Sequence, residues 1–192
     1  MIPVLGEQGA ADLQAKLIRA TVAMAVDSGL APVQLWFCGA DGQTLFDEYC
    51  SDVNDDIHVQ SGKDLGARMD NAFVQTLQDS DFAVLIGTDC PVMGRDYLES
   101  ACAALAAGSD AVLGPAEDGG YVLIGLRHCD SQLFENVAWG TADVLNQTRQ
   151  RLDDLGWSRR ELATQWDVDY PKDLKRLFAL DASFYVSDAS FE

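Results

Sequence analysis

An acidic residue, Asp89, follows an apolar segment in the middle of the chain. The residues before it, Phe82 to Ile86, are all apolar, a pattern typical of a parallel strand that is covered on both faces. Gly87 and Pro91 bracket a turn after this strand. Because ligands of open α/β sheets bind beyond the carboxyl ends of the strands, Asp89 is predicted to lie in a ligand crevice. A carboxylate in that position suits a divalent cation and a phosphate.

A second acidic segment lies far along the chain and contains Asp167 and Asp169, just before Pro171. Carboxylates from separate strand ends can clamp one Mg²⁺ or Mn²⁺ and leave coordination positions open for phosphate oxygens. We therefore predict a metal site formed by Asp89 and Asp169, with Asp167 as the substitute ligand. Alternatively, these acidic residues only stabilise the N-terminus of a helix that begins at Pro171. Asp173, in the first turn of that helix, fits this second role better.

A glycine-rich acidic segment separates two further predicted strands. Glycines allow a ligand to approach the backbone closely, and an adjacent carboxylate could receive a sugar hydroxyl or a proton. The candidate catalytic residues are Asp118 and Glu117, and the candidate substrate-binding residues are Gly119 and Gly120. An ordinary hairpin turn explains the same composition, and on composition alone it is favoured.

The segment from Ser61 to Met69 leads into a predicted helix whose N-terminal turn could bind phosphate. Its candidate substrate-binding residues are Lys63, Asp64 and Arg68. The alternative, locally favoured, is that Asp64 only caps the helix and Arg68 lies on the solvated surface. Trp139 could stack on a sugar ring, although such a tryptophan is more often part of the core.

Strands and helices alternate along the chain, which predicts an α/β layer sandwich of the doubly wound class. The predicted strands are 33–38, 57–60, 82–86, 110–114 and 121–126, and the predicted helices are 10–25, 44–49, 65–77, 96–107, 142–155 (capped by Thr141) and 171–180. We expect a single domain over residues 1–180, followed by a polar tail, 181–192.

Composition restricts the partners and the location that we expect. The formal charge is −18, from 13 Lys and Arg against 31 Asp and Glu, which argues against nucleic acid and anionic membranes as partners. The five cysteines include no C-x-x-C pair, so neither a disulfide framework nor a zinc cluster is indicated. Nothing resembles a signal peptide or a membrane span. We therefore expect a soluble protein of the reducing cytoplasm.

Taken in order, these segments resemble a bacterial family of GT-A-type glycosyltransferases, which are nucleotide-diphospho-sugar transferase-like and long designated a domain of unknown function. The resemblance runs from about Val4 to Leu177. It rests on Gln60 to Met69, which is similar to the family's Q-x-x-G-x-L-G-x-R-M, on Gly87 to Pro91, on Gly114 to Gly125, on Trp139 and on Asp167 to Leu174. It implies a three-layer, Rossmann-like GT-A fold with a mostly parallel sheet. It also implies a nucleotide sugar bound through Mg²⁺ or Mn²⁺, with Asp89 as the metal-binding acid.

The sequence departs from the family pattern at its start. The strand and the basic loop P-x-P-G-x-x-K-T-R-L that usually open the domain are missing, and Val4 to Leu13 resembles the segment that normally comes just after that loop. The missing strand would be central in the sheet, so its place is expected to be closed by repacking, by another segment or by a partner chain, and a homodimer is expected. Two smaller departures are Lys63, where an acidic or small residue is common, and Tyr170, which replaces a threonine at a cost of about 1 kcal/mol in helix capping.

Three functions remain open at this point. The first is metal-dependent transfer of a sugar from a nucleotide-diphosphate sugar to an unknown acceptor, with Asp118 or Glu117 positioning or deprotonating the acceptor. The second is a nucleotidyltransferase that acts on a phosphorylated small molecule, because one fold can serve both reactions. The third is a non-catalytic, truncated homologue that binds a sugar phosphate or a partner protein.

Overall fold

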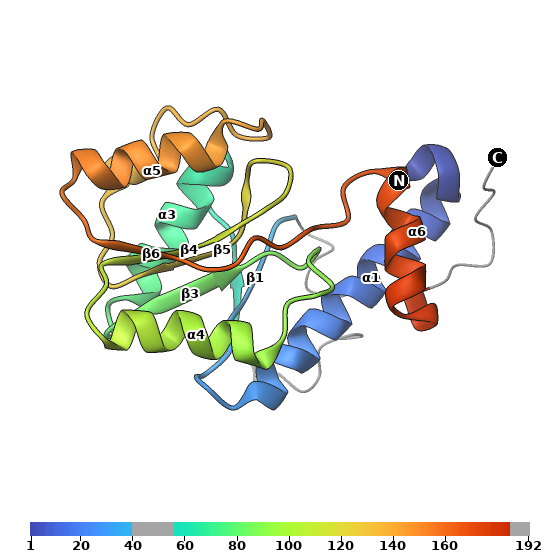
Figure 1. Ribbon diagram of the computed structural model, residues 1–192, viewed down its shortest axis with the longest axis horizontal. Helices are drawn as coiled ribbons and strands as arrows, with labels where there is room; N and C mark the ends of the chain where they lie inside the picture. Colours follow the sequence, from blue (N-terminus) through green and yellow to red (C-terminus); the bar gives the residue numbers. More distant parts are fainter. Residues whose placement is uncertain (40–55, 185–192) are drawn as a thin grey trace.

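The computed structural model describes residues 1–39 and 56–184 as an α/β protein with helices on both faces of its larger sheet (Figure 1). The helices are α1 (Ile2–Ser28), α3 (Leu65–Thr76), α4 (Arg95–Ala106), α5 (Val144–Asp154) and α6 (Pro171–Leu180), with two short 3₁₀ helices, η1 (Ser131–Leu133) and η2 (Ala182–Phe184). The strands are β1 (Leu35–Phe37), β2 (Ile57–Val59), β3 (Ala83–Ile86), β4 (Ala111–Pro115), β5 (Tyr121–Leu126) and β6 (Arg159–Glu161).

The larger sheet has four strands in the order β3-β5-β4-β6. Strand β5 pairs antiparallel with both β3 and β4, whereas β4 and β6 are parallel. Three of the four strands therefore run in the same direction, and β5 is reversed because a short hairpin joins it to β4. The α/β layer fold predicted from the sequence is confirmed, and the sheet is partly parallel and partly antiparallel.

The two faces of this sheet are covered by different helices. On one face Met69 and Phe73 of α3 and Leu152 of α5 pack in one cluster with β4 and β5. On the other face α4 contributes Ala101 and Leu105 to a second cluster. These three layers position the carboxyl ends of β3 and β4 at a common edge, where the sequence predicts the ligand site.

Strands β1 and β2 form a separate parallel pair. Among the described strands, β1 is hydrogen-bonded only to β2, and β3 only to β5. Helix α1 joins the two sheets by packing, because its Val22 contacts Leu35 of β1 while its Met24 belongs to the cluster that contains Val84 of β3. The predicted helix 44–49 lies outside the described residues.

A third apolar cluster, which we call the α1–α6 cluster, lies beside the sheets where α6 packs against the N-terminal part of α1 (Figure 1). Its buried residues are Leu5, Leu13, Leu17, Trp166, Val168, Leu174, Leu177 and Phe184. Helix α1 is longer than predicted and is kinked at Gly6, whose backbone is not helical (φ 68°, ψ 175°). At the start of α6 the Asp173 carboxylate accepts the backbone N–H of Tyr170 at 2.8 Å. The helix-stabilising role predicted for Asp173 is therefore confirmed, and its bond satisfies the N–H of the N-cap residue Tyr170.

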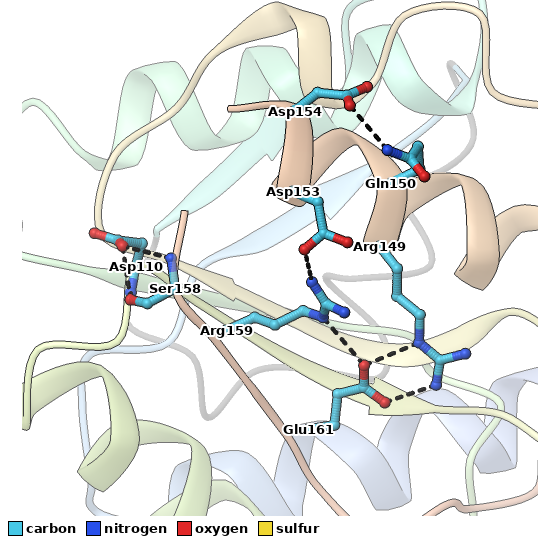
Figure 2. A network of polar contacts seen from close by, with 8 residues as sticks. All are labelled: Asp110, Arg149, Gln150, Asp153, Asp154, Ser158, Arg159 and Glu161. Carbon is cyan, nitrogen blue, oxygen red and sulfur yellow. Dashed lines mark hydrogen bonds and ion pairs between the residues drawn. The ribbon is translucent and has the colours of Figure 1, made fainter. Parts of the chain in front are cut away.

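Strand β6 was not predicted, because Arg159-Arg160-Glu161 has no apolar residue. Polar contacts hold it at the sheet edge instead (Figure 2). Arg149 of α5 binds both oxygens of Glu161, at 2.9 Å and 2.6 Å, and Arg159 pairs with Asp153 and, at 3.3 Å, with Glu161. Ahead of the strand, the Ser158 hydroxyl donates to Asp110 at 2.6 Å.

The predicted cap of α5 is wrong. The helix begins at Val144, with Asp143 at its N-cap, two residues later than predicted. The Thr141 hydroxyl donates to the Ala138 carbonyl at 2.8 Å and so forms part of the preceding turn. Within the described parts of the chain, no helix is long and apolar enough to cross a membrane.

Candidate functional site

Three separate segments meet at the carboxyl edge of the larger sheet, and backbone hydrogen bonds hold them together. Gln165 donates to the Pro115 carbonyl at the end of β4, at 2.9 Å, and accepts from the N–H of Glu117 at 3.0 Å. Three residues later, Val168 donates to the carbonyl of Asp89 at 2.9 Å. The segment before α6 therefore lies across the ends of β3 and β4.

This arrangement gathers four carboxylates that are far apart in sequence. Asp118, Asp167 and Asp169 each offer an oxygen, and the three oxygens lie within 4.8 Å of one another. Asp89 lies close enough for the charges of Asp169 and Asp118 to raise its pKa. We call these four residues the acidic cluster. It contains both predicted ligands, Asp89 and Asp169, the substitute Asp167, and also Asp118, which the sequence suggested as a catalytic residue.

The electrostatics of the acidic cluster favour a cation. Burial, followed by the charges of Asp118, Asp169 and Asp89, raises the pKa of Asp167 to about 7. Burial is also the first cause of the raised pKa values of Asp89 and Asp169. Carboxylates that crowd and repel one another resist ionisation, and a divalent ion would relieve this repulsion. Three convergent carboxylate oxygens match the ligand preference of Mg²⁺ or Mn²⁺, so the residues present fit such an ion.

A cavity of about 150 Å³ opens beside the acidic cluster. Its walls come from the β4–β5 hairpin, the segment before α6 and the first turn of α6, through Glu117, Asp118, Trp166, Asp167, Asp169, Tyr170, Lys172 and Asp173. A ligand in this cavity would contact carboxylates and one lysine. Trp166 and Lys172 were not predicted as site residues, because neither belongs to a motif with a recognisable chemical role.

Glu117, predicted as a catalytic residue, faces a cation instead. Arg176 of α6 binds both of its oxygens, at 2.8 Å and 3.2 Å. This hydrogen-bonded ion pair lowers the pKa of Glu117. A carboxylate held ionised in this way is a poor proton acceptor, so its geometry fits the positioning of Arg176 better than acid–base work.

The glycine-rich segment forms the β4–β5 hairpin, as the alternative interpretation predicted. Asp118 closes the turn by accepting the N–H of Gly120 at 2.8 Å, and this bond also orients the carboxylate within the acidic cluster. Gly119 has a φ of 93°, and a Cβ there would lie 2.3 Å from the Ala142 carbonyl oxygen. Packing therefore explains Gly119 without a ligand, and substrate binding by Gly119 and Gly120 stays a prediction.

The residues predicted near the start of α3 make local contacts. Asp64 accepts the N–H of Ala67 at 2.8 Å and is the N-cap of α3, in agreement with the simpler interpretation. Arg68 donates to the Gly62 carbonyl at 3.5 Å, and Lys63 is exposed. Their binding of a phosphate stays a prediction. Trp139 packs against the cluster below α3 and α5, which favours the core role over sugar stacking.

The chain can be assigned to a family. Residues 21–141, more than half of its length, match the model of a family described as an uncharacterized protein conserved in bacteria (DUF2064). The chain belongs to this family. The DUF2064 match includes Asp89 and Asp118 and ends before Asp167 and Asp169. No curated protein matches the chain.

Solved structures show what this DUF2064 protein is similar to. A protein from Desulfovibrio desulfuricans G20, provisionally named a nucleotide-diphospho-sugar transferase, is 28% identical, with a TM-score of 0.80 over 98% of this chain and 84% of that chain. A CMP:2-keto-3-deoxy-manno-octonic acid synthetase, solved with CTP, is 11% identical, with a TM-score of 0.61 over 88% of both chains. Rv0371c from Mycobacterium tuberculosis H37Rv is 20% identical, with a TM-score of 0.57 over 85% of this chain and 84% of that chain. These similarities confirm the predicted nucleotide-diphospho-sugar transferase-like fold.

Proposed function

We propose that this protein is a metal-dependent transferase that takes a sugar from a nucleotide-diphosphate sugar. The observation that carries the proposal is the convergence of Asp118, Asp167 and Asp169 within 4.8 Å, next to Asp89, at the carboxyl edge of the sheet. The similarity to the D. desulfuricans protein, which extends over nearly the whole chain, supports a nucleotide sugar as the donor.

The residues of the acidic cluster have different roles in this proposal. Asp118, Asp167 and Asp169 would hold Mg²⁺ or Mn²⁺, which when bound neutralises the charge of a diphosphate leaving group. Asp89 lies close enough to Asp169 and Asp118 for their charges to raise its pKa, and it adds negative charge that favours a cation over an anion. The Asp118 carboxylate, oriented by the N–H of Gly120, also lies where it could orient an acceptor hydroxyl.

A nucleotidyltransferase is the second candidate. The observation in its favour is the shared fold with the CTP-bound CMP:2-keto-3-deoxy-manno-octonic acid synthetase. The same acidic cluster could serve a reaction in which a phosphorylated small molecule attacks a nucleoside triphosphate. The two reactions differ in what they release, which is a nucleoside diphosphate in sugar transfer and pyrophosphate in nucleotidyl transfer.

Calorimetric titration with nucleoside diphosphates, nucleoside triphosphates and nucleotide sugars, with and without Mn²⁺, tests this proposal. We expect Mn²⁺-dependent binding of a nucleotide sugar that Asp89→Ala and Asp169→Ala both abolish. Asp79→Asn is the control, because Asp79 is an exposed acidic residue outside the acidic cluster. Triphosphate binding with pyrophosphate release would select the nucleotidyltransferase. A folded protein that binds no nucleotide would favour the non-catalytic interpretation.

A further inference from the structure

The first turn of α6 lines the cavity with Lys172 and Asp173, and Arg176 of the same helix binds Glu117, which also lines the cavity. Arg176 follows Lys172 one turn later on this helix. We propose that Lys172 and Arg176 bind an anionic oxygen group, a phosphate or a carboxylate, of a substrate whose reacting part lies at the acidic cluster. This inference rests on the proposed transferase function and extends it to the charge of the substrate.

Arg176 is held in place before any ligand arrives. Its guanidinium carbon lies 4.3 Å from the ring centroid of Trp166, which is 6% exposed and packed in the α1–α6 cluster. Its nitrogens bind the two oxygens of Glu117 in a forked contact. Stacking on an aromatic ring and a planar fork of donors are the features that suit arginine to recognise phosphate and carboxylate.

Glu117 occupies the place that a ligand oxyanion would take. The side chains of Arg176 and Glu117 are 51% and 55% exposed, and exposed ion pairs contribute little free energy. An anion from solvent can therefore share or replace the Glu117 carboxylate at small cost. Glu117 both orients Arg176 and repels a competing anion, so its removal should strengthen anion binding.

Lys172 adds a second cation on the cavity side. Lys172 lies in the first turn of α6, and its ammonium lies 5.2 Å from the centroid of the Tyr170 ring. Five of the eight residues that line the cavity are acidic, and Lys172 is the basic one among them. In the absence of a bound metal ion, an anionic group would be repelled by these carboxylates, and Lys172 and Arg176 offset that repulsion.

Calorimetric titration with inorganic phosphate, without metal and again with Mg²⁺, tests the inference. We expect Lys172→Gln and Arg176→Gln each to weaken phosphate binding by about fivefold or more, and Glu117→Gln to strengthen it by about twofold. Lys175→Gln makes the same change of charge on α6 and should change phosphate binding by less than about 1.5-fold, because Lys175 does not line the cavity, whereas Arg176 binds Glu117, which does. A second series with saturating nucleoside diphosphate separates the two sources of the oxyanion. Phosphate that still binds belongs to the acceptor site, and phosphate that is displaced reports the nucleotide site.

Two outcomes would overturn the inference. One is phosphate binding that is absent, or that responds equally to Lys172→Gln and Lys175→Gln, which would indicate general charge alone. The other is weaker phosphate binding in Glu117→Gln. Mn²⁺ titration of the same variants keeps this test separate from the proposed function. If the proposed transferase function is wrong, the protein does not bind Mn²⁺. The phosphate titrations without metal still test whether Lys172 and Arg176 bind an anion.

Discussion

The backbone N–H of Val168 donates a 2.9 Å hydrogen bond to the carbonyl oxygen of Asp89. Val168 stands between Asp167 and Asp169, and its own side chain is buried in the α1–α6 cluster. Because side chains alternate along an extended segment, burial of Val168 turns the two aspartates away from that core. This one bond thus brings the end of β3 next to both carboxylates.

Gly87→Ala should weaken Mn²⁺ binding. A Cβ on Gly87 would lie 2.7 Å from Oδ1 of Asp89, so the Asp89 carboxylate must rotate away while the backbone can stay in place. We expect affinity for Mn²⁺, measured by calorimetry, to fall by about tenfold, as when the support of a metal ligand is altered. Gly94→Ala is the control, since a Cβ there meets nothing within 4 Å. Unchanged affinity in Gly87→Ala would show that Asp89 does not support the metal site.

Asp167→Asn should stabilise the metal-free protein at alkaline pH. The folded state raises the pKa of Asp167 from 3.8 to about 7, mainly by burial. The folded protein therefore keeps a proton that the unfolded chain has lost, and stability falls as the pH rises from about 4 to about 7. We expect the variant to melt about 2–4 °C higher at pH 8 and almost unchanged at pH 4, after allowance for solvent screening.

Thermal unfolding in EDTA and in Mg²⁺ provides the check on this prediction. Mg²⁺ should stabilise the wild type more than Asp167→Asn, because the variant lacks one ligand. Asp79→Asn should respond like the wild type under all conditions. A variant that melts lower than the wild type at pH 8 in EDTA would contradict the repulsion inferred for the acidic cluster.

The sequence allowed the main elements to be predicted wherever burial sets the pattern. Tyr121–Leu126 and Pro171–Leu180 have the predicted bounds, because one is a continuous apolar run and the other begins at a proline. Strand β6 escaped prediction because ion pairs rather than apolar contacts hold Arg159–Glu161 at the edge. The hairpin favoured on composition already implied that β5 is antiparallel to β4, but the insertion of β5 between β3 and β4 could not be foreseen from its composition.

The acidic cluster was predictable in part. Asp89 could be found because it follows the apolar run of β3, and Asp169 because it precedes Pro171, the first residue of α6. The role predicted for Asp118 was a different one, since no spacing in the sequence shows that the hairpin end reaches Asp167. The four-residue spacing of Lys172 and Arg176 on a predicted helix was the available signal for two cations beside the cavity. It carried little weight because four-residue spacing of cations on an exposed helix is common.

Glu161→Gln should destabilise the protein above pH 4.5 but not in strong acid. Hydrogen bonds from Arg149 are the first cause of the lowered pKa of Glu161, and Arg159 adds to them (Figure 2). A lowered pKa gives stability that is present above the unfolded value of 4.5 and is lost as the pH falls. We expect a loss of about 0.5–1 kcal/mol at pH 7, measured by urea unfolding, and a smaller loss at pH 3.

Glu99→Gln, on the exposed side of α4, is the matched control for the ion-pair network. It should leave the free energy of unfolding within about 0.5 kcal/mol of the wild type at both pH values. A double-mutant cycle with Arg149→Met would isolate the contact between Glu161 and Arg149. A coupling energy of zero would show that the network does not hold β6.

Gly66→Ala should destabilise the protein, against the intrinsic preference of a helix. In an isolated helix alanine is more favourable than glycine by about 1 kcal/mol. In this protein a Cβ on Gly66 would lie 2.6 Å from Nε1 of Trp139 and 2.7 Å from the Phe134 carbonyl oxygen. The second contact is with backbone, so the variant must shift α3 or the η1 segment, at a cost of about 1–3 kcal/mol. Urea unfolding measures the sign directly, and a more stable variant would show that Trp139 does not pack tightly against α3.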